Sequence, residues 1–205
     1  SFNLHQLLQV GLCYHFHPLD SLFMARKSKN NAATLLGSVR IIGGQWRGRK
    51  LPVHTSDGLR PTGDRVRETL FNWLNAELYD ARCLDLFAGS GALGFEALSH
   101  GASQVTMLEL APTVAKQLLI NKQLLNSDNA NIENVDSLKW LSQYQGDAFN
   151  IIFVDPPFAN QLWDETLTAL ANSTAVDSTS YIYIEHPKNR AIKLPAGWQW
   201  WRQKT

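Results

Sequence analysis

The four residues Asp155-Pro156-Pro157-Phe158 form the stretch of this sequence whose types best suit chemistry. They follow the apolar run at 151–154, which predicts a buried strand that ends at the rim of a sheet. An exocyclic amine on a purine is a poor nucleophile, because its lone pair is delocalised into the ring. Asp155 and a proline carbonyl could accept its two hydrogens, and Phe158 could stack on the base, worth roughly 1–3 kcal/mol. The stretch therefore favours a site that presents a nucleobase amine to an electrophile, with no metal required.

A glycine-rich loop upstream could hold the second reactant. Asp85 lies in the strand expected at 83–87, and Gly89, Gly91 and Gly94 then match the pattern G-x-G-x-x-G. Glycines let the backbone approach a ligand, and a helix that starts after Gly91 favours an anionic group. Glu109 lies 20 residues after Gly89, where it could hold ribose hydroxyls. This loop suits NAD and S-adenosylmethionine alike, but hydride transfer has no use for the Asp-Pro-Pro-Phe stretch, so a nucleotide-modifying methyltransferase is favoured.

Asp136 is a further candidate for cofactor binding. It follows the third expected strand and precedes Ser137-Leu138 at the start of a helix. Its carboxylate could accept a hydrogen bond from the adenine amino group of a cofactor, or it could be the N-cap of that helix. Both roles stay open at this point, and they are compatible.

The elements that must position these residues alternate between strand and helix. Strands are expected at 83–87, 105–109, 131–135, 150–155 and 181–185, and helices near 91–99, 112–125, 138–144 and 162–172. Continuous apolar strands between helices predict an α/β fold, a mostly parallel, doubly wound, Rossmann-like sheet. Such sheets bind ligands at the carboxyl ends of their strands, which is where Gly89, Glu109, Asp136 and Asp155 fall.

Basic residues gather in the first third of the chain. Ten basic and two acidic residues between Arg26 and Arg67 give a net +8, whereas the whole chain carries +1, so the remainder carries −7. Residues 40–44 and 48–53 predict two short strands around a glycine-rich turn. We expect this basic β-hairpin and the helix after it to bind a polyanion. The candidate RNA-binding residues are Arg40, Arg47, Arg49, Lys50, Arg60, Arg65 and Arg67.

The helix after the hairpin opens at 61–64, with Thr62 or Asp64 as the expected N-cap. Its predicted apolar face, at helical spacing, consists of Val66, Leu70, Phe71, Leu74 and Leu78. Arg65 and Arg67 have an alternative reading, in which they pair with Asp64 or Glu68 on a solvated helix.

These motifs together resemble the class I S-adenosylmethionine-dependent methyltransferases. The stretches Arg40-Ile-Ile-Gly-Gly, Trp46-Arg-Gly-Arg-Lys-Leu51 and Arg60-Pro-Thr-x-Asp-Arg-Val-Arg-Glu68 resemble more narrowly the RsmD family of bacterial 16S ribosomal RNA guanine-N2 methyltransferases. The likeness runs from about Val39 to Thr205.

That resemblance implies S-adenosyl-L-methionine as cofactor, held by Asp85, Gly89, Gly91, Glu109 and Asp136. It implies that residues 155–158 hold a guanine, guanine 966 of 16S rRNA by family likeness, and that the hairpin grips RNA. The expected partner is a partly assembled 30S subunit with its ribosomal proteins, and this chain is expected to act on it as a monomer.

Three alternatives remain open. The same tetrapeptide would serve adenine-N6 methylation of DNA, although little chain remains to build a DNA-recognition domain. The basic hairpin alone would serve a non-catalytic RNA-binding ribosome assembly factor. The glycine loop alone would serve a nicotinamide oxidoreductase, for which NADH rather than S-adenosylmethionine would raise the melting temperature.

The ends of the chain do not match the rest. Residues 1–38 read as an N-terminal extension, of which 1–23 resemble an over-extended gene start or added residues and 24–38 a basic flexible tail. Residues 39–58 would be the hairpin and 59–205 the methyltransferase domain. The strand expected at 198–202 has no partner after it, so the family's final antiparallel strand is missing. We therefore expect the natural chain to continue past Thr205, or this edge to be poorly ordered.

The cysteine count and hydropathy favour the cytoplasm. Cys13 and Cys83 are the only cysteines, and Cys83 falls in an apolar strand, which favours a buried thiol in a reducing compartment. No apolar run approaches the roughly 20 residues of a membrane-spanning helix.

Overall fold

The fold is built on one parallel seven-stranded sheet. The computed structural model describes residues 8–11, 36–54, 63–157 and 162–204. The strand order is β6-β5-β4-β7-β8-β1-β9, and each pairing between neighbours is parallel. The strands are β1 (Leu8–Gly11), β4 (Arg82–Asp85), β5 (Gln104–Leu108), β6 (Ala130–Glu133), β7 (Ile151–Val154), β8 (Tyr181–Ile184) and β9 (Trp198–Arg202).

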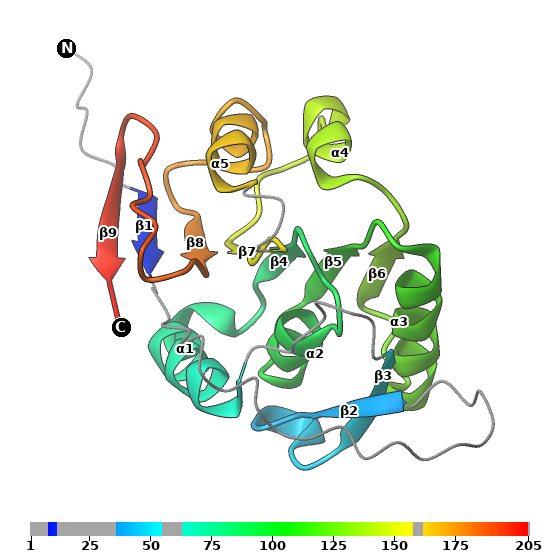
Figure 1. The fold of residues 1–205 in the computed structure, drawn as a ribbon. Helices are drawn as coiled ribbons and strands as arrows, with labels where there is room; N and C mark the ends of the chain where they lie inside the picture. The colour runs from blue at the N-terminus through cyan, green and yellow to red at the C-terminus, as the bar shows by residue number, and fades with distance from the viewer. Residues whose placement is uncertain (1–7, 12–35, 55–62, 158–161, 205) are drawn as a thin grey trace.

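Helices cover both faces of this sheet, as the sequence pattern predicted. One face carries α1 (Asp64–Leu78), α2 (Ala92–Ser99) and α3 (Pro112–Leu125), and the other carries α4 (Ser137–Gln143) and α5 (Trp163–Ala171) (Figure 1). All four residues of β7 are buried, because a central parallel strand packs against helices on both sides. The α/β Rossmann-like fold class is thereby confirmed.

The first helix packs by the face that its spacing predicted. Val66, Leu70, Phe71, Leu74 and Leu78 are all buried, because residues three and four apart share one side of a helix. The N-cap prediction was wrong for the described residues. Gly63 is the N-cap and makes no side-chain capping bond, and Asp64 is the first helical residue. Thr62 lies outside the described residues.

The basic hairpin consists of β2 (Leu36–Arg40) and β3 (Lys50–His54), antiparallel, joined through a 3-10 turn at Gly44–Trp46. It lies over the layer of α2 and α3, on the side away from the sheet (Figure 1). Gly44 has φ +67°, and a Cβ there would lie 1.8 Å from the backbone oxygen of Ser99. A glycine is therefore needed where the hairpin meets α2.

The far edge of the sheet contains a strand that the sequence did not predict. Leu8–Gly11 lies between β8 and β9, with Gln9 opposite Tyr181 on one side and Gln199 on the other. Strand β9 thus has the partner that it lacked in the sequence pattern. The origin of residues 1–23 stays a prediction.

Among the described residues, we find no helix with both the length and the apolar composition needed to cross a membrane.

Candidate functional site

The glycine loop between β4 and α2 has the backbone that only glycine adopts easily. Gly89 has φ +49° and Gly91 has φ +75°, both in the left-handed region. A Cβ on Gly91 would lie 2.6 Å from the ring of Phe95. A Cβ on Gly94 would lie 2.6 Å from the sulfur of Met107 on β5. The first two glycines therefore shape the loop, and Gly94 lets α2 pack closely on the sheet.

Glu109 lies just after β5 and ties the loop in place. Its two carboxylate oxygens accept hydrogen bonds from the backbone N–H of Gly89 at 2.9 Å and of Ala111 at 2.7 Å. Each oxygen keeps a further lone pair for another donor, such as a hydroxyl. Glu109 is half-buried, so the carboxylate stays within reach of a ligand against the loop.

Asp85 is buried directly beneath this loop, with 1% of its surface exposed. Burial raises the pKa of its carboxyl to about 7, although backbone hydrogen bonds from Phe87 and Gly94 act in the opposite direction, and the charge of Glu109 raises it slightly further. Within the described structure, its Oδ1 atom has no hydrogen-bond partner. A buried acceptor without a partner is costly, so this atom is suited to a donor that a ligand would bring.

Asp136 is the N-cap of α4. Its Oδ1 accepts a hydrogen bond from the backbone N–H of Lys139 at 2.9 Å, as an N-cap carboxylate does. Ser137 anchors the same turn to the loop after β4, because its hydroxyl donates to the carbonyl of Leu86. The capping role predicted for Asp136 is thus confirmed, and its contact with a cofactor stays a prediction.

The strand ends that carry Asp85 and Asp155 are neighbours. β4 pairs with β7, with Asp85 opposite Phe153, and the backbone N–H of Leu86 donates to the carbonyl of Phe153 at 3.1 Å. Asp155 is half-buried, Pro156 is buried and Pro157 is exposed. Phe158 lies outside the described residues. The glycine loop and Asp155 therefore follow the carboxyl ends of two neighbouring strands and lie side by side.

Arg67 requires a correction. It was a candidate RNA-binding residue, but its side chain is fully buried. Its guanidinium donates to Glu96 Oε2 at 2.8 Å, to Asp64 Oδ1 at 2.7 Å and to the backbone oxygen of Arg40 at 2.8 Å. A cation enclosed by carboxylates and backbone cannot contact RNA in this conformation. Arg67 instead fixes the hairpin to α1 and α2.

Glu96 completes that attachment. This fully buried residue of α2 accepts hydrogen bonds from the backbone N–H of Ile42 at 3.0 Å and of Gly43 at 2.7 Å. Ser99, one turn later, donates to the carbonyl of Gly43 at 2.6 Å. The sequence analysis missed Glu96, although a lone carboxylate in the apolar helix Ala92–Ser99 was a signal that a buried partner exists.

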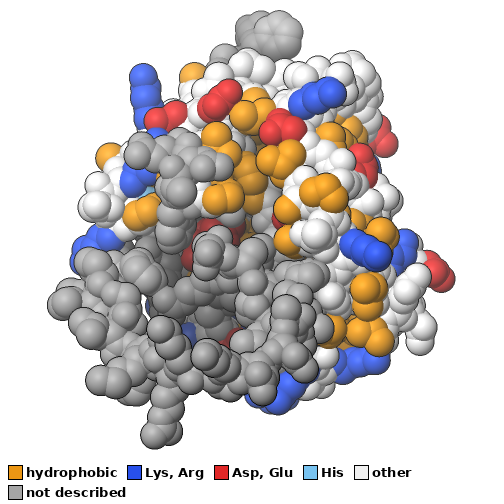
Figure 2. All heavy atoms as spheres, turned by 45° about the vertical axis from the view of Figure 1, so that its right-hand side comes forward, with side chains coloured by type: hydrophobic (Ala, Val, Ile, Leu, Met, Phe, Trp, Pro, Cys, Tyr) orange, Lys and Arg blue, Asp and Glu red, His pale blue; other side chains and the backbone are white. Residues whose placement is uncertain are grey.

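The other basic residues lie at the surface. Arg47, Lys50 and Arg65 are exposed. Arg40 is exposed but pairs with Asp64 at 3.0 Å, and Arg49 donates to the backbone oxygen of Leu124 at 2.8 Å. Arg60 lies outside the described residues. Figure 2, which turns the α3 side forward, shows blue Lys and Arg side chains spread around this face.

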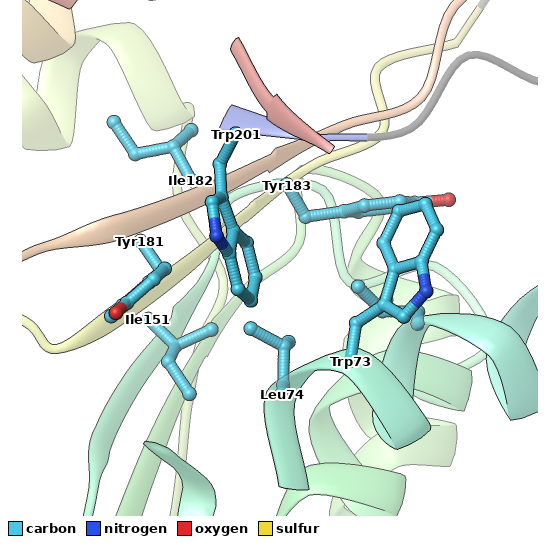
Figure 3. Close-up of a pocket in the computed structure, with 8 residues that line it drawn as sticks. Trp73, Leu74, Ile151, Tyr181, Ile182, Tyr183 and Trp201 are labelled. Atoms are coloured by element: carbon cyan, nitrogen blue, oxygen red, sulfur yellow. The ribbon is translucent and has the colours of Figure 1, made fainter. Parts of the chain in front are cut away.

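Neither of two hollows that described residues outline is lined by Gly89 or Asp155. One of about 200 Å³ lies between the hairpin and the start of α1, lined by Arg40, Arg47, Asp64 and Glu68 among others. The other is an apolar gap of about 10 Å³ between α1 and the sheet (Figure 3). That gap is about the size of one water molecule, so it is a packing defect and not a ligand site.

The end of β8 carries two residues that the sequence analysis also missed. The hydroxyl of Tyr183 donates to Glu185 Oε2 at 2.8 Å. Burial, followed by the charges of Glu185 and Asp155, raises the pKa of Tyr183 well above its ordinary value. The signal was available, since Glu185 follows an apolar strand just as Asp155 does.

Comparison with known proteins agrees with this geometry. A family model described as "Conserved hypothetical protein 95" matches residues 39–205. The chain is 50% identical over 170 residues to "Ribosomal RNA small subunit methyltransferase D" of Escherichia coli K12, which covers 82% of this chain and 85% of that protein. It is 49% identical to the Haemophilus influenzae protein of the same name, over 82% of this chain and 89% of that one.

Solved structures of proteins described as methyltransferases also resemble this chain. A putative methyltransferase from Escherichia coli, yhhF, superposes with a TM-score of 0.72 at 48% identity, covering 78% of this chain and 87% of that one. A putative methylase from Haemophilus influenzae gives a TM-score of 0.67 at 45% identity, with the same coverage. The family model covers the hairpin from Val39 onward, the glycine loop and the strand ends described above, and the identity to these relatives covers most of both chains, so the chain belongs to the RsmD family.

Proposed function

We propose that this chain is an S-adenosylmethionine-dependent methyltransferase that acts on the exocyclic N2 of a guanine in 16S ribosomal RNA. By family likeness the target is guanine 966, in a partly assembled cytoplasmic 30S subunit with its ribosomal proteins. The observation that carries the proposal is the adjacency of the β4 and β7 ends, which brings the glycine loop beside Asp155-Pro156-Pro157. The names of the relatives in Escherichia coli and Haemophilus influenzae support the ribosomal RNA substrate.

The residues of the β4–β5 edge fit such a donor. Gly89 exposes backbone in a left-handed turn, Glu109 has lone pairs to spare for ribose hydroxyls, and Asp85 offers an unpartnered oxygen to an ammonium group. When bound, S-adenosylmethionine would supply an electrophilic methyl group and a neutral thioether leaving group. A structure of a putative methyltransferase with S-adenosylhomocysteine bound has a similar fold, with a TM-score of 0.53 at 17% identity.

Asp155 and the backbone of Pro156 would act on the acceptor. They accept hydrogen bonds from the two N2 hydrogens, so the nitrogen lone pair turns toward the methyl group. A methylated N2 must lose one proton, and the Asp155 carboxylate that is hydrogen-bonded to this amine would accept it. Orientation supplies much of the remaining rate enhancement.

Asp155→Asn tests this role. We expect kcat for methyl transfer to 30S particles to fall by roughly 100-fold or more, because a positioned acceptor of this kind contributes about 10²–10⁴-fold. Asp128→Asn, at an exposed aspartate after α3, is the matched control and should keep full activity. S-adenosylhomocysteine should still raise the melting temperature of both variants.

The other functions make different predictions for the same assay. Unchanged activity in Asp155→Asn would contradict the role of its carboxylate as the proton acceptor. RNA binding by the unaltered protein without any N2-methylguanosine would favour the assembly factor instead. Methyl transfer to adenine in DNA, with none to RNA, would favour the DNA methyltransferase.

A further inference from the structure

The end of β8 places a second carboxylate beside Asp155. Val154 and Ile184 are register partners, and the backbone N–H of Glu185 donates to the carbonyl of Val154 at 3.0 Å. Asp155 and Glu185 therefore leave adjacent parallel strands at the same level. Neither residue belongs to the glycine loop. They form a separate pair of hydrogen-bond acceptors on the side of the site where the base that receives the methyl group would bind.

Both carboxylates face the same side of the sheet. Side chains alternate along a strand, so Asp155 shares a face with Phe153 and Glu185 with Tyr183. The rings of Phe153 and Tyr183 do meet on that face, with centroids 6.3 Å apart. The charge of Asp155 also acts on the buried hydroxyl of Tyr183, which agrees with its lying on this side.

Glu185 is held more firmly than a strand end requires. Tyr183, only 2% exposed, donates its hydroxyl to Glu185 Oε2 at 2.8 Å. From the opposite face of the sheet, the indole N–H of buried Trp163 donates to the backbone oxygen of Glu185 at 2.7 Å. In Figure 3 the Tyr183 hydroxyl points away from the apolar gap lined by Tyr181 and Trp201. These two hydrogen bonds together fix the position of Glu185 and the direction in which its carboxylate points.

Two neighbouring acceptors distinguish the purines by their hydrogen-bonding edges. Guanine carries two adjacent donors, N1–H and the 2-amino group. Adenine carries its 6-amino group beside N1, which is an acceptor. A carboxylate accepts hydrogen bonds and donates none, so a second carboxylate is satisfied by guanine and opposed by the lone pair of adenine N1. A site built to bind an N–H rejects an analogue that lacks it, because its own polar group is then left unpaired.

We propose that Glu185 is a specificity-determining residue that accepts a hydrogen bond from N1–H of the target guanine while Asp155 accepts from its 2-amino group, an inference that rests on the proposed function. Tyr183 is then a positioning residue, which acts through Glu185 and does not touch the base. The pair reads guanine through two donors that lie side by side, and the basic hairpin contributes to RNA binding without reading this edge.

The test uses 30S particles with guanine or 2,6-diaminopurine at the target position. Diaminopurine keeps the 2-amino group but presents an acceptor at N1. We expect the full chain to favour guanine by roughly 10- to 100-fold in kcat/KM for transfer of labelled methyl from S-adenosylmethionine. Glu185→Gln should bring this ratio close to one, because the glutamine amide can donate to N1 of diaminopurine. Tyr183→Phe should lower the ratio by a smaller factor.

Controls separate specificity from folding. Glu165→Gln changes an exposed glutamate of α5 and should leave the ratio unchanged. An unaltered rise in melting temperature with S-adenosylhomocysteine would show that each variant is folded. If the unaltered protein used both bases equally, or if Glu185→Gln kept the original preference, the inference would be overturned. If guanine particles received no methyl group at all, the proposed function would fail and the inference with it.

Discussion

Two buried carboxylates, Glu96 beneath the hairpin and Asp85 beneath the glycine loop, have opposite surroundings. Both lie almost wholly inside the protein, with 0% and 1% of their surface exposed. Glu96 is matched by the guanidinium of Arg67 and by backbone N–H groups of the hairpin. Asp85 has no cation among the described residues that bond to it, and its Oδ1 lacks a partner.

The difference distinguishes a carboxylate that attaches the hairpin from one that is available to bind a ligand. A buried ion pair whose lone pairs are all used is fixed in place and has nothing to offer a ligand. A buried carboxyl with an unused oxygen is held at a cost that a ligand could offset. The hairpin is therefore attached through complete interactions, whereas the region under the glycine loop keeps an acceptor available.

The largest effect is expected for Arg67→Ala. Removing the guanidinium leaves Glu96 charged and buried without its cation, which typically costs about 3–5 kcal/mol. We expect urea denaturation to show a loss of unfolding free energy of that size. Arg65→Ala, on the exposed side of the same helix, should change it by less than about 0.5 kcal/mol.

A double variant separates the effect of the unpaired buried charge from the effect of lost packing. Arg67→Met with Glu96→Gln removes both charges, while the glutamine oxygen still accepts from Ile42 and Gly43. We expect this protein to recover part of the stability that Arg67→Ala loses, because the uncompensated charge is absent. A double variant as unstable as the single one would mean that lost packing, not the buried charge, causes the effect.

The sequence predicted those parts of the molecule that are determined by residues close together in the chain. The apolar spacing of α1, the glycine loop before α2 and the helix cap at Asp136 each depend on a few neighbouring positions. Local sterics and hydrogen bonding decide them. The alternation of apolar strands and helices likewise predicted a parallel sheet with Asp155 at the carboxyl end of one of its strands, but not the order of the strands.

The parts that it did not predict depend on distant partners. Arg67 looked like its exposed neighbour Arg65, and only the packing of α2, with Glu96 29 residues away, makes it internal. The proposed role of Glu185 depends on its position beside Asp155 and Tyr183, and this position follows from the parallel pairing of β7 and β8. The strand at Leu8–Gly11 is too short to be recognised without the edge that it pairs with.

Asp85 should give the protein an unusual pH dependence. The folded pKa of about 7 lies above the ordinary value of 3.8, so the folded state binds this proton more tightly. Its stabilising contribution is present below about pH 4 and is lost as the pH rises to about 7, by up to about 1.4 kcal/mol per pH unit.

Asp85→Asn, which cannot ionise, isolates this contribution. The unfolding free energy of the variant minus that of the unaltered protein should increase between pH 5 and pH 7 and then level off. Urea denaturation at a series of pH values without donor measures it. A difference that stays constant with pH would show that Asp85 is ionised throughout, and the contrast with Glu96 would no longer hold.

The smallest effect on stability, and a clear one on binding, is expected for Arg47→Ala. Arg47 is exposed at the turn of the hairpin and lines the hollow beside α1, so its loss should change the unfolding free energy by less than about 0.5 kcal/mol. If it contacts an RNA phosphate, the slope of log affinity against log salt should fall in magnitude by about 1. Lys193→Ala, exposed between β8 and β9, serves as the control with an unchanged slope. Equal slopes for Arg47→Ala and the unaltered protein would place the RNA on another surface, because the buried Arg67 cannot take over the contact while it holds Glu96.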